Sequence, residues 1–134
     1  MLTTELTSPR KQSILIIEDE EAVRHLLRCC LEEAGYIVSE APNGRKGVYA
    51  FRKAPTDLVI TDIYMPERDG LEVIESLRRS RPTVKILVIS AASGTMDYFK
   101  LARAAGASAL RKPFALQTLL SQVAFLLGKA ATHM

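Results

Sequence analysis

Five polar residues that could hold a metal ion and move a phosphoryl group stand at the ends of apolar runs. Glu18 and Asp19 follow the first run, Asp62 the third and Ser90 the fourth, while the fifth run leads to Lys112. When strands alternate with helices in an open sheet, ligands bind outside the carboxyl ends of the strands. The five side chains are therefore expected at one edge of a sheet, to which the second run adds no obvious site residue.

The three acids indicate a magnesium site. Carboxylates held close together repel one another and resist ionisation, and a hard divalent cation removes that conflict. Mg²⁺ takes oxygen ligands in octahedral geometry and usually keeps several waters. Asp19 and Asp62 could bind the ion directly, whereas Glu18 could bind it directly or through a water molecule.

The same set is sufficient for reversible formation of an acyl phosphate. The carboxylate of Asp62 is a competent nucleophile toward phosphorus. Phosphoryl transfer requires little beyond positioning and stabilisation of the charge on the phosphoryl oxygens. The ammonium group of Lys112 offers a compact positive charge, and the hydroxyl of Ser90 can donate a hydrogen bond to a phosphoryl oxygen.

Each residue also has an ordinary structural interpretation. Asp19 could cap a helix N-terminus, and Ser90 could be a cap or turn residue. Glu18 and Lys112 could be exposed surface charges. Compatible chemistry at four strand ends at once is harder to explain in this way, which favours the functional interpretation.

Alternating hydrophobic patterns predict the elements that position these residues. The continuous apolar run Ser13–Ile17 predicts a strand buried on both faces. Glu21–Ala34 has apolar residues at helical spacing, and Gly35 can end that helix. Further strands are predicted at Tyr36–Ser39, Asp57–Thr61, Lys85–Ile89 and Ser108–Arg111, and further helices at Arg45–Ala54, Leu71–Arg79, Met96–Ala105 and Leu116–Leu127. The (βα)₅ order predicts a doubly wound, five-stranded parallel sheet with helices on both faces.

Length and composition fit one globular α/β domain. The 134 residues are 48% hydrophobic and 25% charged, which argues against disorder. We expect a flexible arm over residues 1–12, the domain over 13–129 and a tail over 130–134. No apolar run approaches the roughly 20 residues of a membrane span, and residues 1–12 lack the apolar stretch of a signal peptide. A cytoplasmic protein without membrane contact is expected.

Charge and cysteine content exclude two other classes. The net charge is +3, but no more than two basic residues are adjacent. A solvated surface, without direct nucleic-acid binding, is the simpler interpretation. Cys29 and Cys30 are neighbours and too few for a disulfide framework, so they are expected to pack on a helix.

The motifs, in their order and separations, resemble the receiver domains of bacterial-type two-component response regulators. The resemblance covers about Ile14 to Leu127. It is carried by the segments Ile14–Glu20, Glu40–Gly44, Asp57–Pro66 with Asp69-Gly70, Val88–Ala91, Gly106-Ala107 and Lys112–Phe114. Any one of these segments would be weak alone. Together they imply a flavodoxin-like receiver fold with strand order 2-1-3-4-5.

The resemblance assigns roles to the acidic residues. It implies that Asp62 is the phosphorylated aspartate and that Asp19 is a direct Mg²⁺ ligand. Glu18 would be the second acid, contacting the ion through water. The backbone carbonyl of Tyr64 would complete the protein's share of the metal ligands.

The resemblance also implies a pair of phosphoryl-binding residues and a set of partners. Ser90 and Lys112 match that pair, and the Lys112-Pro113 bond would be cis. A sensor histidine kinase or a histidine phosphotransfer protein would donate the phosphoryl group, contacting helix Glu21–Ala34 and the loop after the fifth strand. A stand-alone receiver of this kind is not a conventional enzyme, since it catalyses only its own phosphorylation and dephosphorylation. It would act as a monomer or weak homodimer on an output protein that the sequence does not name.

Two positions depart from the family pattern. Ala109 stands where the family commonly has Tyr or Phe, so the usual relay to the face of the fourth and fifth helices is in question. We expect Tyr98, Phe99 or Phe114 to carry part of that response. Tyr64, two residues after the acceptor, predicts slower loss of phosphate than a small residue would give.

Other functions stay open as alternatives. The chain could be the receiver fragment of a larger DNA-binding or kinase protein, or an interaction module independent of phosphorylation. A dinucleotide-binding domain would need a Gly-x-Gly-x-x-Gly turn after the first strand, where this chain has Glu18-Asp19-Glu20. A phosphatase with an aspartyl nucleophile would usually have a second Asp at the position of Tyr64, and a flavin domain would need a phosphate-binding loop in place of the acids.

Overall fold

The protein is built on a five-stranded parallel sheet of order β2-β1-β3-β4-β5. The computed structural model describes residues 11–62, 70–90, 100 and 103–128. The strands are β1 (Ser13–Ile17), β2 (Ile37–Ala41), β3 (Leu58–Asp62), β4 (Lys85–Ser90) and β5 (Ser108–Arg111). The predicted strand order and sheet type are thus confirmed.

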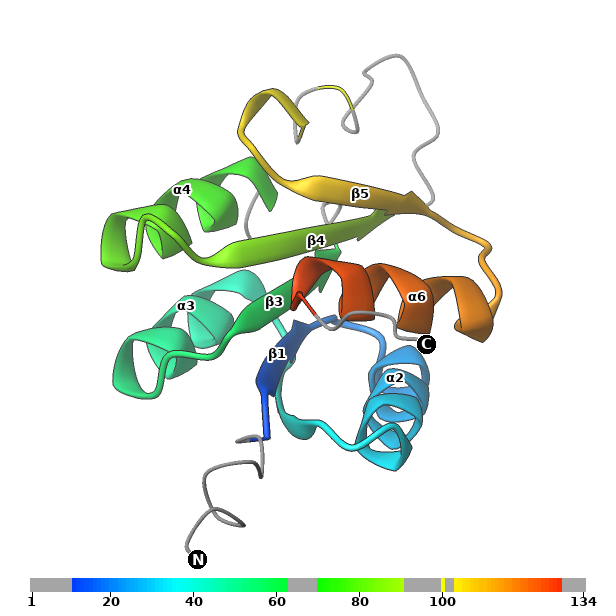
Figure 1. Ribbon diagram of the computed structural model, residues 1–134. Coiled ribbons are helices and arrows are strands. Elements are labelled where there is room, and N and C mark those ends of the chain that lie inside the picture. The colour runs from blue at the N-terminus through cyan, green and yellow to red at the C-terminus, as the bar shows by residue number, and fades with distance from the viewer. Residues whose placement is uncertain (1–10, 63–69, 91–99, 101–102, 129–134) are drawn as a thin grey trace, which may run out of the picture.

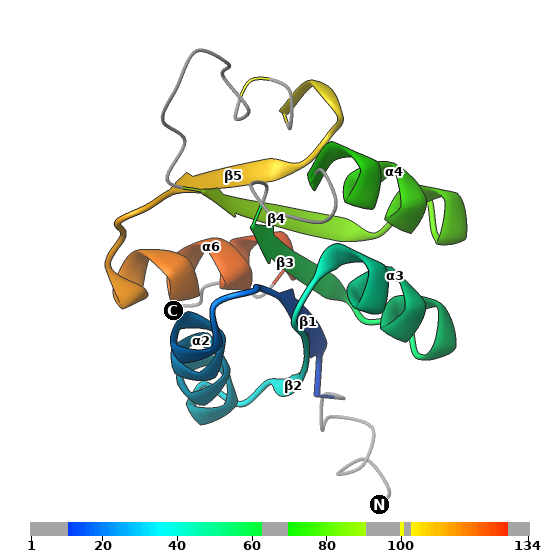
Figure 2. The same cartoon turned by 180° about the vertical axis from the view of Figure 1, so that it is seen from behind.

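Four helices among the described residues cover the two faces of this sheet. They are α2 (Glu21–Glu33), α3 (Gly44–Lys53), α4 (Gly70–Ser80) and α6 (Leu116–Leu126). Helices α2 and α6 lie on one face, and α3 and α4 lie on the other (Figures 1 and 2). Most of the predicted helix Met96–Ala105 falls outside the described residues, as do most of the predicted arm and all of the predicted tail.

Strand β1 is apolar from Ile14 to Ile17 because both of its faces are buried. Ile14 and Ile16 pack into the core beneath α2 and α6, whereas Leu15 and Ile17 pack into the core beneath α3 and α4. All four are at most 1% exposed. Successive side chains of a strand point to opposite faces, so a strand covered on both sides needs apolar residues at every position.

Several predicted boundaries differ from the observed ones by a residue or two. Strand β3 begins at Leu58 rather than Asp57, and the Asp57 carboxylate accepts the N–H of Ser13, the first residue of β1, at 2.8 Å. Strand β2 extends to Ala41 because parallel pairing with β1 continues through Ala41, which lies opposite Ile17. As a result of such shifts, Asp62 and Ser90 are the last residues of their strands rather than the first residues after them.

The start of α3, directly after β2, depends on one capping residue. The Asn43 side chain accepts a hydrogen bond from the Lys46 N–H at 2.8 Å. Asn43→Ala is expected to lower the free energy of unfolding by about 1 kcal/mol, because that N–H loses its partner. Urea unfolding would measure the change. Asn43→Asp is the control and should stay close to wild type, and equal losses in both variants would contradict the capping role.

Candidate functional site

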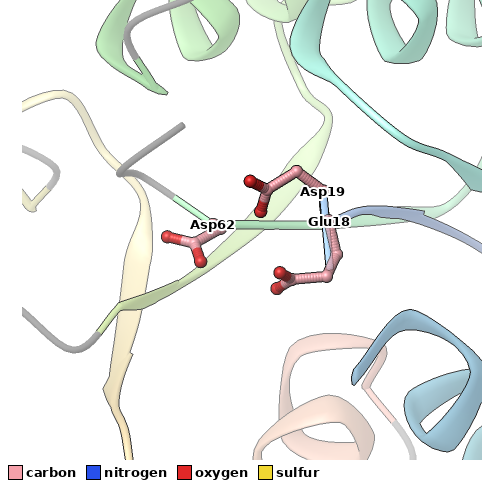
Figure 3. A group of neighbouring side chains, drawn as sticks. All are labelled: Glu18, Asp19 and Asp62. Atoms are coloured by element: carbon pink, nitrogen blue, oxygen red, sulfur yellow. The ribbon is translucent and has the colours of Figure 1, made fainter. Parts of the chain in front are cut away.

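Three carboxyl groups gather at the carboxyl ends of β1 and β3. Glu18 and Asp19 follow β1 directly, and Asp62 ends β3; one ligand atom from each residue lies within 4.8 Å of the others (Figure 3). Glu18 is 1% exposed and Asp62 is buried, while Asp19 faces solvent. The fold therefore brings Asp19 and Asp62, which are 43 positions apart in sequence, close together at one edge of the sheet.

Lys112 lies against two of these acids. Its Nζ atom is 3.0 Å from Asp62 Oδ2 and 3.4 Å from Glu18 Oε1, and the side chain is half-buried. Burial lowers the pKa of Lys112, but the hydrogen bond and charge of Asp62, together with Glu18, outweigh it and raise the pKa overall. The ammonium group therefore stays charged, and its interpretation as a surface charge is wrong.

Burial governs the ionisation of Glu18. Removal from water raises the pKa of this carboxyl group, while the Glu20 N–H and the Lys112 charge oppose the rise. The Glu20 N–H donates to Glu18 Oε2 at 3.2 Å. The interpretation of Glu18 as an ordinary exposed acid is therefore wrong, because its side chain is buried.

The donor set fits a small divalent cation. Three carboxylates and one ammonium leave a formal excess of two negative charges, which is the charge that one divalent ion cancels. An octahedral Mg²⁺ shell with ligands at about 2.0–2.1 Å is about 4 Å across. The carboxylate spread of up to 4.8 Å therefore suits direct binding by some oxygens and water-mediated binding by another.

Ser90 lies at the neighbouring strand end. It is fully buried and ends β4, and the register places Ile89, the residue before it, opposite Asp62. Its carbonyl accepts the Lys112 N–H at 2.9 Å, which links the end of β4 to the segment that carries the lysine. Ser90 is thus a strand residue and not a turn or cap residue. Tyr64, the predicted carbonyl ligand, lies outside the described residues.

Asp19 does not cap the first helix. The N-cap position of α2 is Glu20, and no side chain donates or accepts a capping hydrogen bond there. The capping interpretation of Asp19 is therefore wrong.

Sequence reasoning did not identify an ion-pair network that joins α2 and β2 next to Glu18. Arg24 donates from Nη1 to the Glu18 carbonyl at 2.8 Å and pairs through Nε with Glu40 at 2.8 Å. Arg28 pairs with the other Glu40 oxygen at 2.6 Å. The available signal was two arginines four residues apart on a predicted helix, with an acid near the end of the second strand.

The structure tests some of the remaining expectations that came from the family resemblance. Ala109 lies in β5 opposite Val88. The cis Lys112-Pro113 bond implied by the resemblance is confirmed. Phe114 is half-buried and packs with the core beneath α2 and α6. Tyr98 and Phe99 lie outside the described residues, so their expected part in switching stays a prediction.

Comparison with known proteins decides the family. The family model described as the response regulator receiver domain matches residues 14–124. The chain belongs to the response regulator receiver family. Receiver domains are signalling modules rather than conventional enzymes, and they bind Mg²⁺ through acidic residues. A group of acidic residues lies at this edge of the sheet.

Longer regulators are among the relatives of this receiver. It is 37% identical over 116 residues to the response regulator MprA of Mycolicibacterium vanbaalenii, covering 87% of the chain and 50% of that relative. It is 35% identical over 122 residues to the transcriptional regulatory protein PcoR of Escherichia coli, covering 91% and 54%. The receiver therefore spans about half the length of these relatives.

Solved structures of similar receivers match nearly end to end. The Vibrio cholerae chemotaxis protein CheY4 has a TM-score of 0.79 at 28% identity, with 87% of this receiver and 99% of that chain covered. A CheY-like receiver domain protein of Methanospirillum hungatei has a TM-score of 0.84 at 25% identity, with 90% and 96% covered. Within the described part of the receiver, no helix is long and apolar enough to cross a bilayer.

Proposed function

We propose that this receiver accepts a phosphoryl group on Asp62 in a Mg²⁺-dependent reaction and signals through a change in partner binding. The observation that carries the proposal is the position of Asp62, buried between a cluster of acids and the Lys112 ammonium 3.0 Å away. A buried carboxylate beside a cation and a group of metal-ligating oxygens is suited to forming an acyl phosphate.

The proposed step is a transfer from a phosphohistidine donor. An Asp62 carboxylate oxygen forms a bond to phosphorus, and the phosphorus–nitrogen bond breaks. The electron pair of that bond stays on the departing imidazole nitrogen, which takes up a proton from solvent. Lys112 balances charge on the phosphoryl oxygens, and the Ser90 hydroxyl donates to one of them. Glu18, Asp19, Asp62 and the Tyr64 carbonyl would hold Mg²⁺, which supplies further neutralisation of phosphoryl charge when bound.

The donor and output belong to the same proposal. We propose a sensor histidine kinase or histidine phosphotransfer protein as donor, docking on α2 and the loop after β5. The receiver would act over residues 13–129 as a monomer or weak homodimer, with an output protein rather than nucleic acid or membrane as its target. It would catalyse no reaction beyond its own phosphorylation and dephosphorylation.

A second candidate is the receiver portion of a longer regulator. The observation that favours it is that the chain covers only 50–54% of MprA and PcoR, the latter a transcriptional regulatory protein. In that case the output would be an attached domain rather than a separate partner. The length of the native reading frame tests this candidate directly.

The wild-type receiver is expected to gain one phosphoryl group from acetyl phosphate only when Mg²⁺ is present. The reason is the excess negative charge of the acidic group, which repels an anionic donor until a cation is bound. Intact mass spectrometry would measure the gain, and excess chelator is the control. A gain that persists with chelator would contradict the metal requirement, and no gain under any condition would favour a phosphorylation-independent interaction module.

A further inference from the structure

One peptide unit controls how two candidate metal ligands leave the backbone. Glu18 and Asp19 are adjacent, so the plane of the peptide between them sets the direction of both side chains. Glu18 is anchored on one side by its N–H, which donates to the Ala41 carbonyl of β2 at 3.1 Å. The Glu20 N–H adds a second restraint by donating to Glu18 Oε2 at 3.2 Å. A rotation of the Glu18 carbonyl would still change the direction in which Asp19 leaves the backbone.

Arg24 holds this carbonyl. Its Nη1 atom donates to the Glu18 oxygen at 2.8 Å from the first turns of α2. The Arg24 side chain is only 15% exposed, so the bond is shielded from competing water. A charge-assisted donor of this kind forms a stronger hydrogen bond than a neutral one.

Arg24 is itself held in place by Glu40, which also binds Arg28. Its Nε donates to Glu40 Oε1 at 2.8 Å, and Arg28 occupies the other Glu40 oxygen at 2.6 Å. Hydrogen bonds from Arg28 and Arg24 keep the pKa of Glu40 below its ordinary value. The carboxylate is thus charged at neutral pH and fixes the guanidinium that contacts Glu18.

We propose that Arg24 is a positioning residue for metal binding, orienting Glu18 and Asp19 through the peptide that joins them. This inference rests on the proposed function, because it assumes that those acids bind Mg²⁺. Residues that orient metal ligands from behind typically change metal affinity by about 10–100-fold when replaced. Arg24 acts on the backbone rather than on a ligand atom, so an effect near the lower end is expected.

The direction in which Mg²⁺ affinity changes when Arg24 is replaced distinguishes a positioning role from simple charge repulsion. Arg24 is a cation close to an acidic group, and a cation repels a bound divalent ion. Removing its charge alone would therefore tighten Mg²⁺ binding. If Arg24 positions the acids, its removal weakens binding in spite of the lost charge.

The experiment measures metal affinity without phosphorylation. Mn²⁺ binding to the full chain is followed by the electron paramagnetic resonance signal of the free ion, and Mg²⁺ affinity is obtained by competition. Arg24→Gln is expected to raise the Mg²⁺ dissociation constant about tenfold. Arg24→Lys keeps the charge but loses the forked donor geometry that reaches both Glu18 and Glu40, so it should also weaken binding.

Arg28→Gln is the matched control. It removes a cation from the same helix and an ion pair with the same Glu40, but Arg28 has no bond to the Glu18 carbonyl. Its Mg²⁺ affinity should stay within about twofold of wild type, since only a more distant charge is lost. Melting temperatures without metal show whether each variant is folded, and Arg24→Lys keeps the test available if Arg24→Gln fails to fold.

The outcomes separate the inference from the function on which it rests. Arg24→Gln binding Mg²⁺ as tightly as wild type, or more tightly, would overturn the inference while leaving the metal site intact. Equal weakening by Arg28→Gln would overturn it as well, because the effect would then belong to the ion pairs and not to the carbonyl contact. A wild-type chain that binds neither ion would overturn the proposed metal site and this inference together.

Discussion

Asp62→Asn is expected to abolish the Mg²⁺-dependent phosphoryl gain. The asparagine keeps the size and place of the side chain at the end of β3, but its amide lacks the anionic oxygen that would attack phosphorus. Loss of a covalent nucleophile typically costs a thousandfold or more in rate, so uptake should fall by at least about that factor. Intact mass spectrometry after incubation with acetyl phosphate measures it.

Asp19→Asn is the matched control for this experiment. It removes a neighbouring carboxylate from the same acidic group but leaves the proposed nucleophile. This variant should still gain one phosphoryl group, at a higher Mg²⁺ concentration. Uptake by Asp62→Asn at the wild-type rate would show that another carboxylate is the acceptor, and peptide mapping of the labelled chain would identify it.

The arrangement of the acids was predictable because it depends on topology. Parallel strands that alternate with helices bring their carboxyl ends to one edge, and the uninterrupted apolar runs around Leu15 and Ile60 reveal strands buried on both faces. Motif resemblance added the strand order and the cis bond before Pro113. These features follow from patterns that are local in sequence or shared by a family.

The ion pairs were less predictable because they depend on packing between distant segments. Lys112 contacts Glu18 across 94 positions and Asp62 across 50, and no local pattern reports those distances. Glu40 lies in a strand that contributed no obvious site residue, yet α2 places two arginines against it. Treated one at a time, Asp19, Ser90 and Lys112 also suggested a cap, a turn and a surface charge, and the structure contradicts all three.

Lys112→Met is expected to separate metal binding from phosphoryl transfer. Methionine has a similar unbranched length, so it fills the space without the charge or the donors. In the wild-type chain the ammonium lies 3.0 Å from Asp62 and 3.4 Å from Glu18, where it competes with a cation for the same oxygens. A unit charge about 5 Å from a divalent ion costs about 1–2 kcal/mol even in water, so its removal should tighten Mg²⁺ binding about tenfold.

The effect on phosphoryl uptake should have the opposite direction. Without the ammonium, one stabiliser of the phosphoryl oxygens is lost, and removing a single such donor typically slows a reaction about a hundredfold or more. Both quantities should be measured at about pH 8, because the pKa of the buried Glu18 carboxyl rises further when Lys112 no longer opposes the effect of burial.

Lys112→Arg keeps the positive charge and is the control for the first effect, since its Mg²⁺ affinity should stay near that of wild type. Tighter Mg²⁺ binding together with slower uptake in Lys112→Met would assign the lysine to the phosphoryl group rather than to metal binding. Weaker Mg²⁺ binding in a folded Lys112→Met chain would instead mean that the ammonium organises the acids, and uptake at the wild-type rate would remove Lys112 from the proposed mechanism.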